Sequence, residues 1–201
     1  MKYNADTHYR RSIRLKGYDY SKDGVYFVTM CTQNRECLFG EIKNGEMIFN
    51  EYGEIIKFTW FDLINHNVNI LLDYFVIMPN HIHGIIVITN NENIVGAGSK
   101  PALVKSALIK NNHDVTRAAT RVGLEPTPTK CELSEIVRQL KTFSAKRINQ
   151  LRGTSSVAVW QRNYYDHIIR NENELNQIRE YVVNNSLKWD LDRNNVENLY
   201  M

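Results

Sequence analysis

Residues 70–89 read ILLDYFVIMPNHIHGIIVIT, two runs rich in β-branched and aromatic residues that are separated by Pro79-Asn80. Apolar runs of this length, bounded by turn residues, are typical of β-strands. The stretch therefore predicts two consecutive strands, one over 70–78 and one over 82–89. This pair is the part of the chain from which the other elements can be placed.

His81 and His83 are expected to lie on one face of this sheet, because side chains alternate along a strand. Two imidazoles held in this way can bind one divalent cation when a third ligand comes from elsewhere. A lone His-x-His is also compatible with two hydrogen-bonded histidines at a strand end. The apolar surroundings favour the ligand role, since burying two polar rings without a partner is costly.

The flanking sequence alternates further strands with amphipathic helices. Upstream are a strand at 25–32, a hairpin of 38–43 and 46–49 about Asn44-Gly45, and a helix at 51–66. Downstream are helices at 133–151 and about 172–187, joined by a short segment at 157–170. This order predicts an α+β fold, an antiparallel sheet with helices packed on it.

Residues 90–130 interrupt the pattern with several glycines and prolines and few large apolar residues. This stretch is long for a structureless loop in a compact domain. We therefore expect a single domain spanning 1–201 that carries a mobile or functional insertion at 90–130.

The composition of the 201-residue, 23.5 kDa chain is that of an ordinary globular protein, with 43% apolar and 23% charged residues. No apolar run approaches the ~20 residues of a membrane-spanning helix, and the first twenty residues lack the apolar core of a secretory signal. Cys31, Cys37 and Cys131 form no CxxC pair, which argues against a disulfide framework or a zinc finger. These features predict a cytoplasmic protein.

The net charge is only +3, but the charges are segregated along the chain. Residues 1–22 and 96–130 each hold six Lys or Arg against two acids, and 133–152 hold five against one. Residues 36–75 hold two basic residues against seven acids. Segregation of this kind favours a basic surface for a polyanion. Solvated helix faces and a mobile loop are the alternative interpretation.

Tyr181 and Asn185 are four residues apart in the last predicted helix and share one of its faces. A phenol is a poor nucleophile when neutral and needs a nearby cation or base. On its own, Tyr-x-x-x-Asn is a common packing pattern. It gains weight from the histidine pair, which could hold such a cation.

Residues 159–170, VWQRNYYDHIIR, interleave aromatic residues with Arg162 and Arg170. This composition is typical of a surface on which bases stack beside phosphate-binding cations. Core aromatics in a capped strand or turn are the alternative. Asp166 could orient His167 by a hydrogen bond, and either residue could hydrogen-bond to a metal-binding side chain and hold it in place.

Four motifs together resemble the REP-associated tyrosine transposases, a branch of the single-tyrosine HUH transposases. They are RRSIRLK at 10–16, MPNHIHG at 78–84, WQRNYYDHIIR at 160–170 and REYVVNN at 179–185. The His-Ile-His within the second resembles the motif after which the HUH endonucleases are named. The motifs span most of the chain outside 90–130.

This resemblance implies a ferredoxin-like, RRM-like HUH fold and a metal-dependent transesterification on single-stranded, hairpin-bearing DNA. It implies Tyr181 as the nucleophile that forms a 5′-phosphotyrosine, and His81, His83 and Asn185 as ligands of Mg²⁺ or Mn²⁺. A nucleoid-associated protein without a membrane partner is expected, as a monomer or a homodimer. The expected DNA contacts are Arg10, Arg11, Arg14, Lys16, Arg138, Lys141, Arg162 and Arg170.

Two other functions are compatible with these residues. A relaxase or replication-initiator nickase would share the metal site and a tyrosine, but the short chain favours the transposase. A non-catalytic regulator that binds DNA hairpins would need only the basic surface. The chain has no GxxxxGK[ST] phosphate-binding motif, which agrees with a transesterification that requires no nucleotide hydrolysis.

Overall fold

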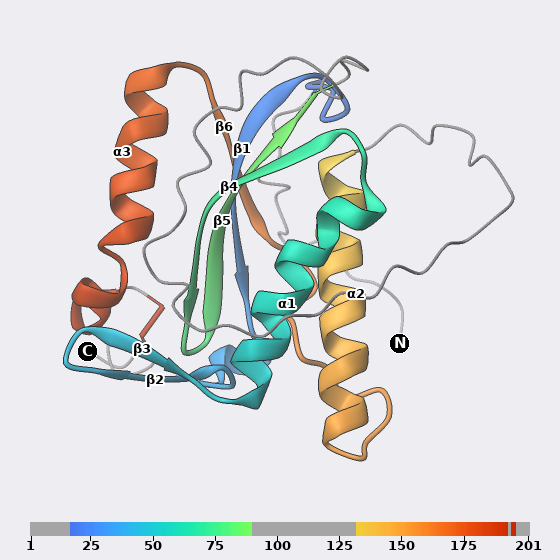
Figure 1. Cartoon of the computed structure of the whole chain (residues 1–201), viewed down its shortest axis with the longest axis vertical. Helices are drawn as coiled ribbons and strands as arrows, with labels where there is room; N and C mark the ends of the chain where they lie inside the picture. The colour runs from blue at the N-terminus through green and yellow to red at the C-terminus, as the bar shows by residue number, and fades with distance from the viewer. Residues whose placement is uncertain (1–16, 90–131, 193, 196–201) are drawn as a thin grey trace, which may run out of the picture. The chain divides into compact units, whose positions relative to one another are not determined.

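A four-stranded antiparallel sheet forms the centre of the fold, with strand order β4-β5-β1-β6 (Figure 1). Its strands are β1 (Gly24–Cys31), β4 (Ile70–Met78), β5 (His81–Ile88) and β6 (Tyr165–Ile169). A separate two-stranded sheet is made by the hairpin of β2 (Gly40–Lys43) and β3 (Glu46–Phe49). The computed structural model describes residues 17–89, 132–192, 194 and 195. The N-terminal arm (residues 1–16) and the insertion at 90–130 lie outside these residues, and what is expected of them stays a prediction.

Helices cover both faces of the sheet (Figure 1). Helices α1 (Glu51–His66) and α2 (Leu133–Leu151) lie on one face, and α3 (Glu172–Val183) lies on the other. The chain order β1-α1-β4-β5-α2-β6, with β1 and β5 in the middle of the sheet, is the ferredoxin-like βαββαβ arrangement. The α+β prediction is confirmed. No helix within the described ranges combines the length and the apolar character needed to cross a bilayer.

The larger core fills the space between the sheet and helices α1 and α2. Its strand residues come from every second position, as alternation requires, and include Tyr26, Val28, Met30, Ile82 and Ile86. Gly84 lies on the same face, directly under the indole of Trp60, which stacks on Phe75 with ring centroids 4.3 Å apart. The residue after the histidine pair thus lets α1 approach the sheet closely.

Gly84→Ala is expected to destabilise the protein by about 1–3 kcal/mol, the usual cost of overpacking a core. A Cβ at this position would lie 2.2 Å from Cη2 of Trp60, so the stacked indole would have to move. Chemical denaturation measures the change. Val68→Ala, at a side chain that is 94% exposed, should shift the free energy of unfolding by less than about 0.5 kcal/mol. Equal stabilities for Gly84→Ala and the parent protein would contradict this packing.

Two elements differ from the sequence-based prediction. Strand β6 was not expected, because it is a five-residue edge strand whose sequence contains Asp166 and His167. Helix α3 ends at Val183 rather than near 187, and a 3₁₀ helix, Ser186–Leu191, follows. The weak helix propensity of Asn184, Asn185 and Ser186 accounts for the earlier end.

Candidate active site

The register of the sheet brings residues from three strands into one row. Thr29 of β1 pairs with His83 of β5 on one side and with Tyr165 of β6 on the other. Directly paired residues of antiparallel strands point to the same face. The row therefore faces α3, as do His81 and the apolar cluster that seats this helix.

His81 and His83 lie in this face with their side chains almost completely buried, at 0% and 1% exposed. Their Nε2 atoms are 3.1 Å apart. Two ligands about 2.1 Å from one ion and at a right angle to each other are about 3 Å apart. The spacing of the two nitrogens therefore suits two ligands of a single cation.

Hydrogen-bonding partners at Nδ1 hold both rings with their Nε2 atoms toward each other. The Nδ2 of Asn80 donates to the backbone oxygens of Arg35 and Asn194, so its Oδ1 faces Nδ1 of His81 at 2.8 Å. This contact suits the His81 tautomer that carries its proton on Nδ1 and leaves Nε2 available as a ligand atom. In His83, Nδ1 lies 2.8 Å from Thr29 Oγ1. This arrangement of supporting partners is usual for metal-binding histidines.

Asp192 belongs to the same cluster, and Asn185 offers a further oxygen donor in the adjoining pocket. Oδ2 of Asp192 lies 3.7 Å from Nε2 of His81, and the potential ligand atoms of Asp192 and the two histidines all lie within 4.8 Å of one another. Asn185 is 3% exposed, and within the described residues its Oδ1 has no hydrogen-bond partner. A buried amide oxygen without a partner is costly and suits a cation ligand.

Tyr181 lies on α3 with its hydroxyl 3.2 Å from Nε2 of His83. Its ring stands edge-on to those of His83 and Phe27, and the side chain is 43% exposed. The helix is fixed two residues earlier, where Nε and Nη2 of Arg179 donate to Asp73 of β4 at 3.0 and 2.6 Å. The tyrosine is thus held beside the histidines yet remains open to solvent.

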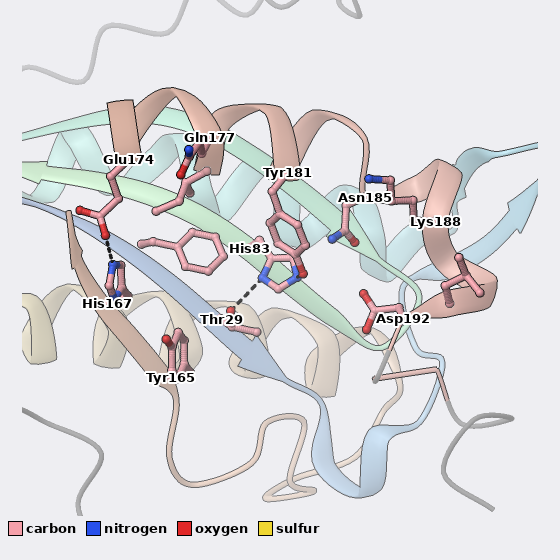
Figure 2. Close-up of a pocket in the computed structure, with 13 residues that line it drawn as sticks. Thr29, His83, Tyr165, His167, Glu174, Gln177, Tyr181, Asn185, Lys188 and Asp192 are labelled. Carbon is pink, nitrogen blue, oxygen red and sulfur yellow. Dashed lines mark hydrogen bonds and ion pairs between the residues drawn. The ribbon is translucent and has the colours of Figure 1, made fainter. Parts of the chain in front are cut away.

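These side chains meet in a pocket of about 640 Å³ between the sheet, α3 and the segment that follows it (Figure 2). Tyr181, His83, Asn185 and Asp192 lie at one end, and His167 and Glu174 lie at the other (Figure 2). Among the described lining residues, Lys188 is the only Lys or Arg. The pocket therefore combines a tyrosine hydroxyl, a set of potential metal ligands and one lysine.

Comparison with known proteins identifies the family to which this site belongs. The sequence model of the family described as "Transposase IS200 like" matches residues 124–185, the stretch that contains Tyr181 and Asn185. The chain belongs to the IS200-like transposases. A Haemophilus influenzae protein described as uncharacterized is 40% identical over 193 residues, 96% of each chain. A solved structure titled as a REP-associated tyrosine transposase bound to a REP hairpin has a similar fold, with a TM-score of 0.50 and 15% identity over 90% of this chain and 73% of that one.

Among the metal ligands expected in this transposase, the structure brings His81 and His83 together and places Asn185 in the same pocket. Asp192 was missed. It follows the 3₁₀ helix Ser186–Leu191, where the four-residue spacing that relates Tyr181 to Asn185 no longer applies. A lone acid eleven residues beyond the tyrosine gives no sequence signal of its own.

The expected supporting pair Asp166 and His167 is separated by the sheet. Asp166 pairs with Val28 and so faces α1 and α2, whereas His167 pairs with Phe27 and faces the pocket. His167 Nε2 instead lies 2.7 Å from Glu174 Oε1. The backbone N–H of Arg170, and then the imidazole of His167, hold the pKa of the Glu174 carboxyl below its ordinary value. Asp166 therefore does not orient His167.

None of the expected DNA contacts that the structure describes lines the pocket. Arg138 pairs with Glu135 on the surface of α2, and Lys141 donates to the backbone oxygens of Gln161 and Asn163 at 2.9 and 2.8 Å. Burial lowers the pKa of the Lys141 ammonium to about 8. Arg162 and Arg170 are exposed, and Arg10, Arg11, Arg14 and Lys16 lie outside the described residues.

Proposed function

We propose that this transposase cleaves and rejoins single-stranded DNA by transesterification, with Tyr181 as the nucleophile and a divalent cation held by His81 and His83. The observation that carries the proposal is the position of the Tyr181 hydroxyl, 3.2 Å from Nε2 of His83, which is itself 3.1 Å from Nε2 of His81. Packing alone does not require two buried imidazole nitrogens and a half-exposed phenol to converge.

The cation would be Mg²⁺ or Mn²⁺, since Asn185 and Asp192 offer oxygen ligands beside the two imidazoles. When bound, such an ion supplies positive charge that polarises the scissile phosphate. Asn80 and Thr29 hold the two rings with their Nε2 atoms toward the ion. Asn185 gains a partner for an amide oxygen that otherwise has none among the described residues.

Tyr181 would lose its proton to solvent, and its oxygen would form a bond to the phosphorus of the scissile phosphodiester. The bond from phosphorus to the 3′ oxygen breaks in the same step, and this oxygen leaves as a 3′ hydroxyl after taking up a proton. The product is a 5′-phosphotyrosine. Attack by another 3′ hydroxyl reverses the reaction, so the phosphodiester energy is conserved and no nucleotide cofactor is needed.

The proposed substrate is a single strand next to a DNA hairpin. The fold resembles that of a protein whose structure contains a REP hairpin, and four sequence motifs resemble the REP-associated branch. A flexible single strand can enter the open pocket and stack its bases there, which a paired duplex cannot do. We therefore propose that the hairpin provides recognition and that the adjoining strand is cleaved.

A denaturing gel with labelled DNA tests the proposal. Hairpin-bearing single strands from the regions that flank the gene, labelled at the 5′ or the 3′ end, are incubated with protein and Mn²⁺ or EDTA. We expect a free 3′-hydroxyl fragment from one label and a protein-linked fragment from the other, both only with Mn²⁺. Binding without a covalent product, across several hairpins and with Mg²⁺ as well as Mn²⁺, would contradict cleavage and favour the non-catalytic regulator.

The basic N-terminal arm is expected to contact phosphates. Replacing Arg10, Arg11 and Arg14 with alanine should reduce the log–log slope of affinity against salt by about 0.7 for each lost contact to a single strand. Fluorescence anisotropy over a salt series measures this slope. Lys57→Ala, which removes a cation from α1, should leave the slope unchanged. An unaltered slope in the triple variant would remove the arm from the interface.

A further inference from the structure

Tyr165 lies in the same pocket as the proposed reactive groups, at the start of the edge strand β6. It begins β6 and pairs with Thr29, which pairs with His83, so these three side chains form one row across the sheet. Neighbouring strands are about 4.8 Å apart, which puts the Cα of Tyr165 about 10 Å from that of His83. Figure 2 shows Tyr165 and Tyr181 on opposite sides of the Thr29–His83 pair, in the same pocket.

The three aromatic residues of the WQRNYYDHIIR motif have different environments. Trp160 is 8% exposed and donates its Nε1 proton to Ser144 Oγ at 2.9 Å. Tyr164 is partly buried against the core, with the Lys141 ammonium 5.7 Å from its ring centre. Tyr165 is 40% exposed and, within the described ranges, its side chain makes no hydrogen bond or ring contact. The motif thus contributes two packing aromatics and one aromatic that is available to a ligand.

The part of the sheet around Tyr165 is left open by α3. The apolar cluster under this helix consists of Phe27, Ile85, Ile169 and Val182 with partly buried neighbours on β1, β4 and α3. Tyr165 lies outside this cluster, on the edge strand. An open aromatic ring in the same pocket as the proposed nucleophile offers a flat apolar face of the kind on which a nucleobase stacks.

We propose that Tyr165 stacks on the base of one of the two nucleotides that share the scissile phosphate. The proposal rests on the proposed function, because it takes the Tyr181 end of the pocket as the place where the phosphate lies. A base stacked on Tyr165 would hold the DNA strand across the row of Tyr165, Thr29 and His83. This limits where the scissile phosphate can lie relative to Tyr181. Tyr165 is thus a substrate-binding residue that selects the cleavage position.

The test combines protein variants with DNA that lacks single bases. All proteins carry Tyr181→Phe so that the DNA stays intact, and the probes are hairpin-bearing single strands with one abasic site moved along the strand. With Tyr165 present, an abasic site at one position should weaken binding by about 5- to 150-fold, the range for one lost base–aromatic stack. Tyr165→Ala should weaken binding of intact DNA by a similar factor and abolish the penalty at that position.

Two variants serve as controls in the same anisotropy assay. Tyr165→Phe keeps the ring and should retain both the affinity and the abasic profile. Phe58→Ala removes a 60% exposed aromatic from α1, on the opposite side of the sheet, and should also leave both unchanged. A Tyr165→Ala protein with unaltered affinity and an unaltered abasic profile would overturn the proposal.

The binding test of Tyr165 and the adduct test of the transferase chemistry can fail separately. Covalent adduct formation by the protein with Tyr181 intact, together with an unchanged Tyr165→Ala profile, would overturn the stacking and leave the proposed function standing. A penalty that depends on Tyr165, with no metal-dependent adduct, would support the stacking and overturn the chemistry. Absence of any binding to single strands would overturn both.

Discussion

Tyr181→Phe is expected to abolish the covalent protein–DNA adduct and cleavage while leaving DNA affinity nearly unchanged. The substitution removes one hydroxyl, which lies 3.2 Å from Nε2 of His83, and keeps the ring that packs edge-on to His83 and Phe27. The lost hydrogen bond should cost about 0.5–1.5 kcal/mol of stability, so the fold should persist. A denaturing gel for the adduct and anisotropy for binding, on the same DNA, separate the two effects.

Tyr165→Phe is the matched control for this experiment, since it removes a hydroxyl from a second exposed tyrosine of the same pocket. It should form the adduct at the parental level. Persistent cleavage by Tyr181→Phe would assign the nucleophile to Tyr164 or Tyr165 instead. Loss of DNA binding in Tyr181→Phe would show that the hydroxyl is needed for more than chemistry.

His83→Ala should reduce metal-dependent cleavage by more than about 100-fold at subsaturating Mn²⁺. Removing even a residue that only supports a metal ligand lowers metal affinity by about 10- to 100-fold, so loss of the ligand itself should cost more. His83 also provides one of two nitrogens that are 3.1 Å apart, and His81 alone cannot replace that pair. Cleavage rates measured over a Mn²⁺ titration report the change.

Thr29→Val and His167→Ala are the comparison variants for the Mn²⁺ titration of His83→Ala. Thr29→Val removes the oxygen that lies 2.8 Å from Nδ1 of His83 and should shift the titration to higher Mn²⁺ with recovery at saturation. His167→Ala alters the far end of the pocket and should leave the metal requirement unchanged. Identical titrations for His83→Ala and the parent protein would refute the metal role of this histidine.

The local part of the site could be predicted because it depends on periodicity. Alternation in residues 70–89 placed His81 and His83 on one face, and helical spacing related Tyr181 to Asn185. The sheet confirms the common face of the two histidines, and the pocket is lined by His83, Tyr181 and Asn185, with His81 beside His83. The α+β fold followed from the order of elements, which local sequence patterns define.

The parts that could not be predicted depend on long-range contacts. Strand β6 is defined by pairing with β1, about 140 residues earlier in the chain, and its short polar sequence gives little strand signal. Recognition of this strand would have separated Asp166 from His167 by simple alternation. Asp192 reaches His81 only because the chain turns back after α3. The Lys141 ammonium is directed to backbone oxygens by tertiary structure, which its basic composition does not reveal.

The most direct test of the central claim is to identify the residue that carries DNA after reaction. The intact protein is incubated with a hairpin-bearing single strand and Mn²⁺, the adduct is digested with nuclease and protease, and the modified peptide is sequenced by mass spectrometry. We predict a 5′-phosphonucleotide on Tyr181, absent when EDTA replaces the metal. A nucleotide on another residue, or an adduct that forms equally in EDTA, would contradict the assignment of Tyr181 and the histidine pair as the reactive centre.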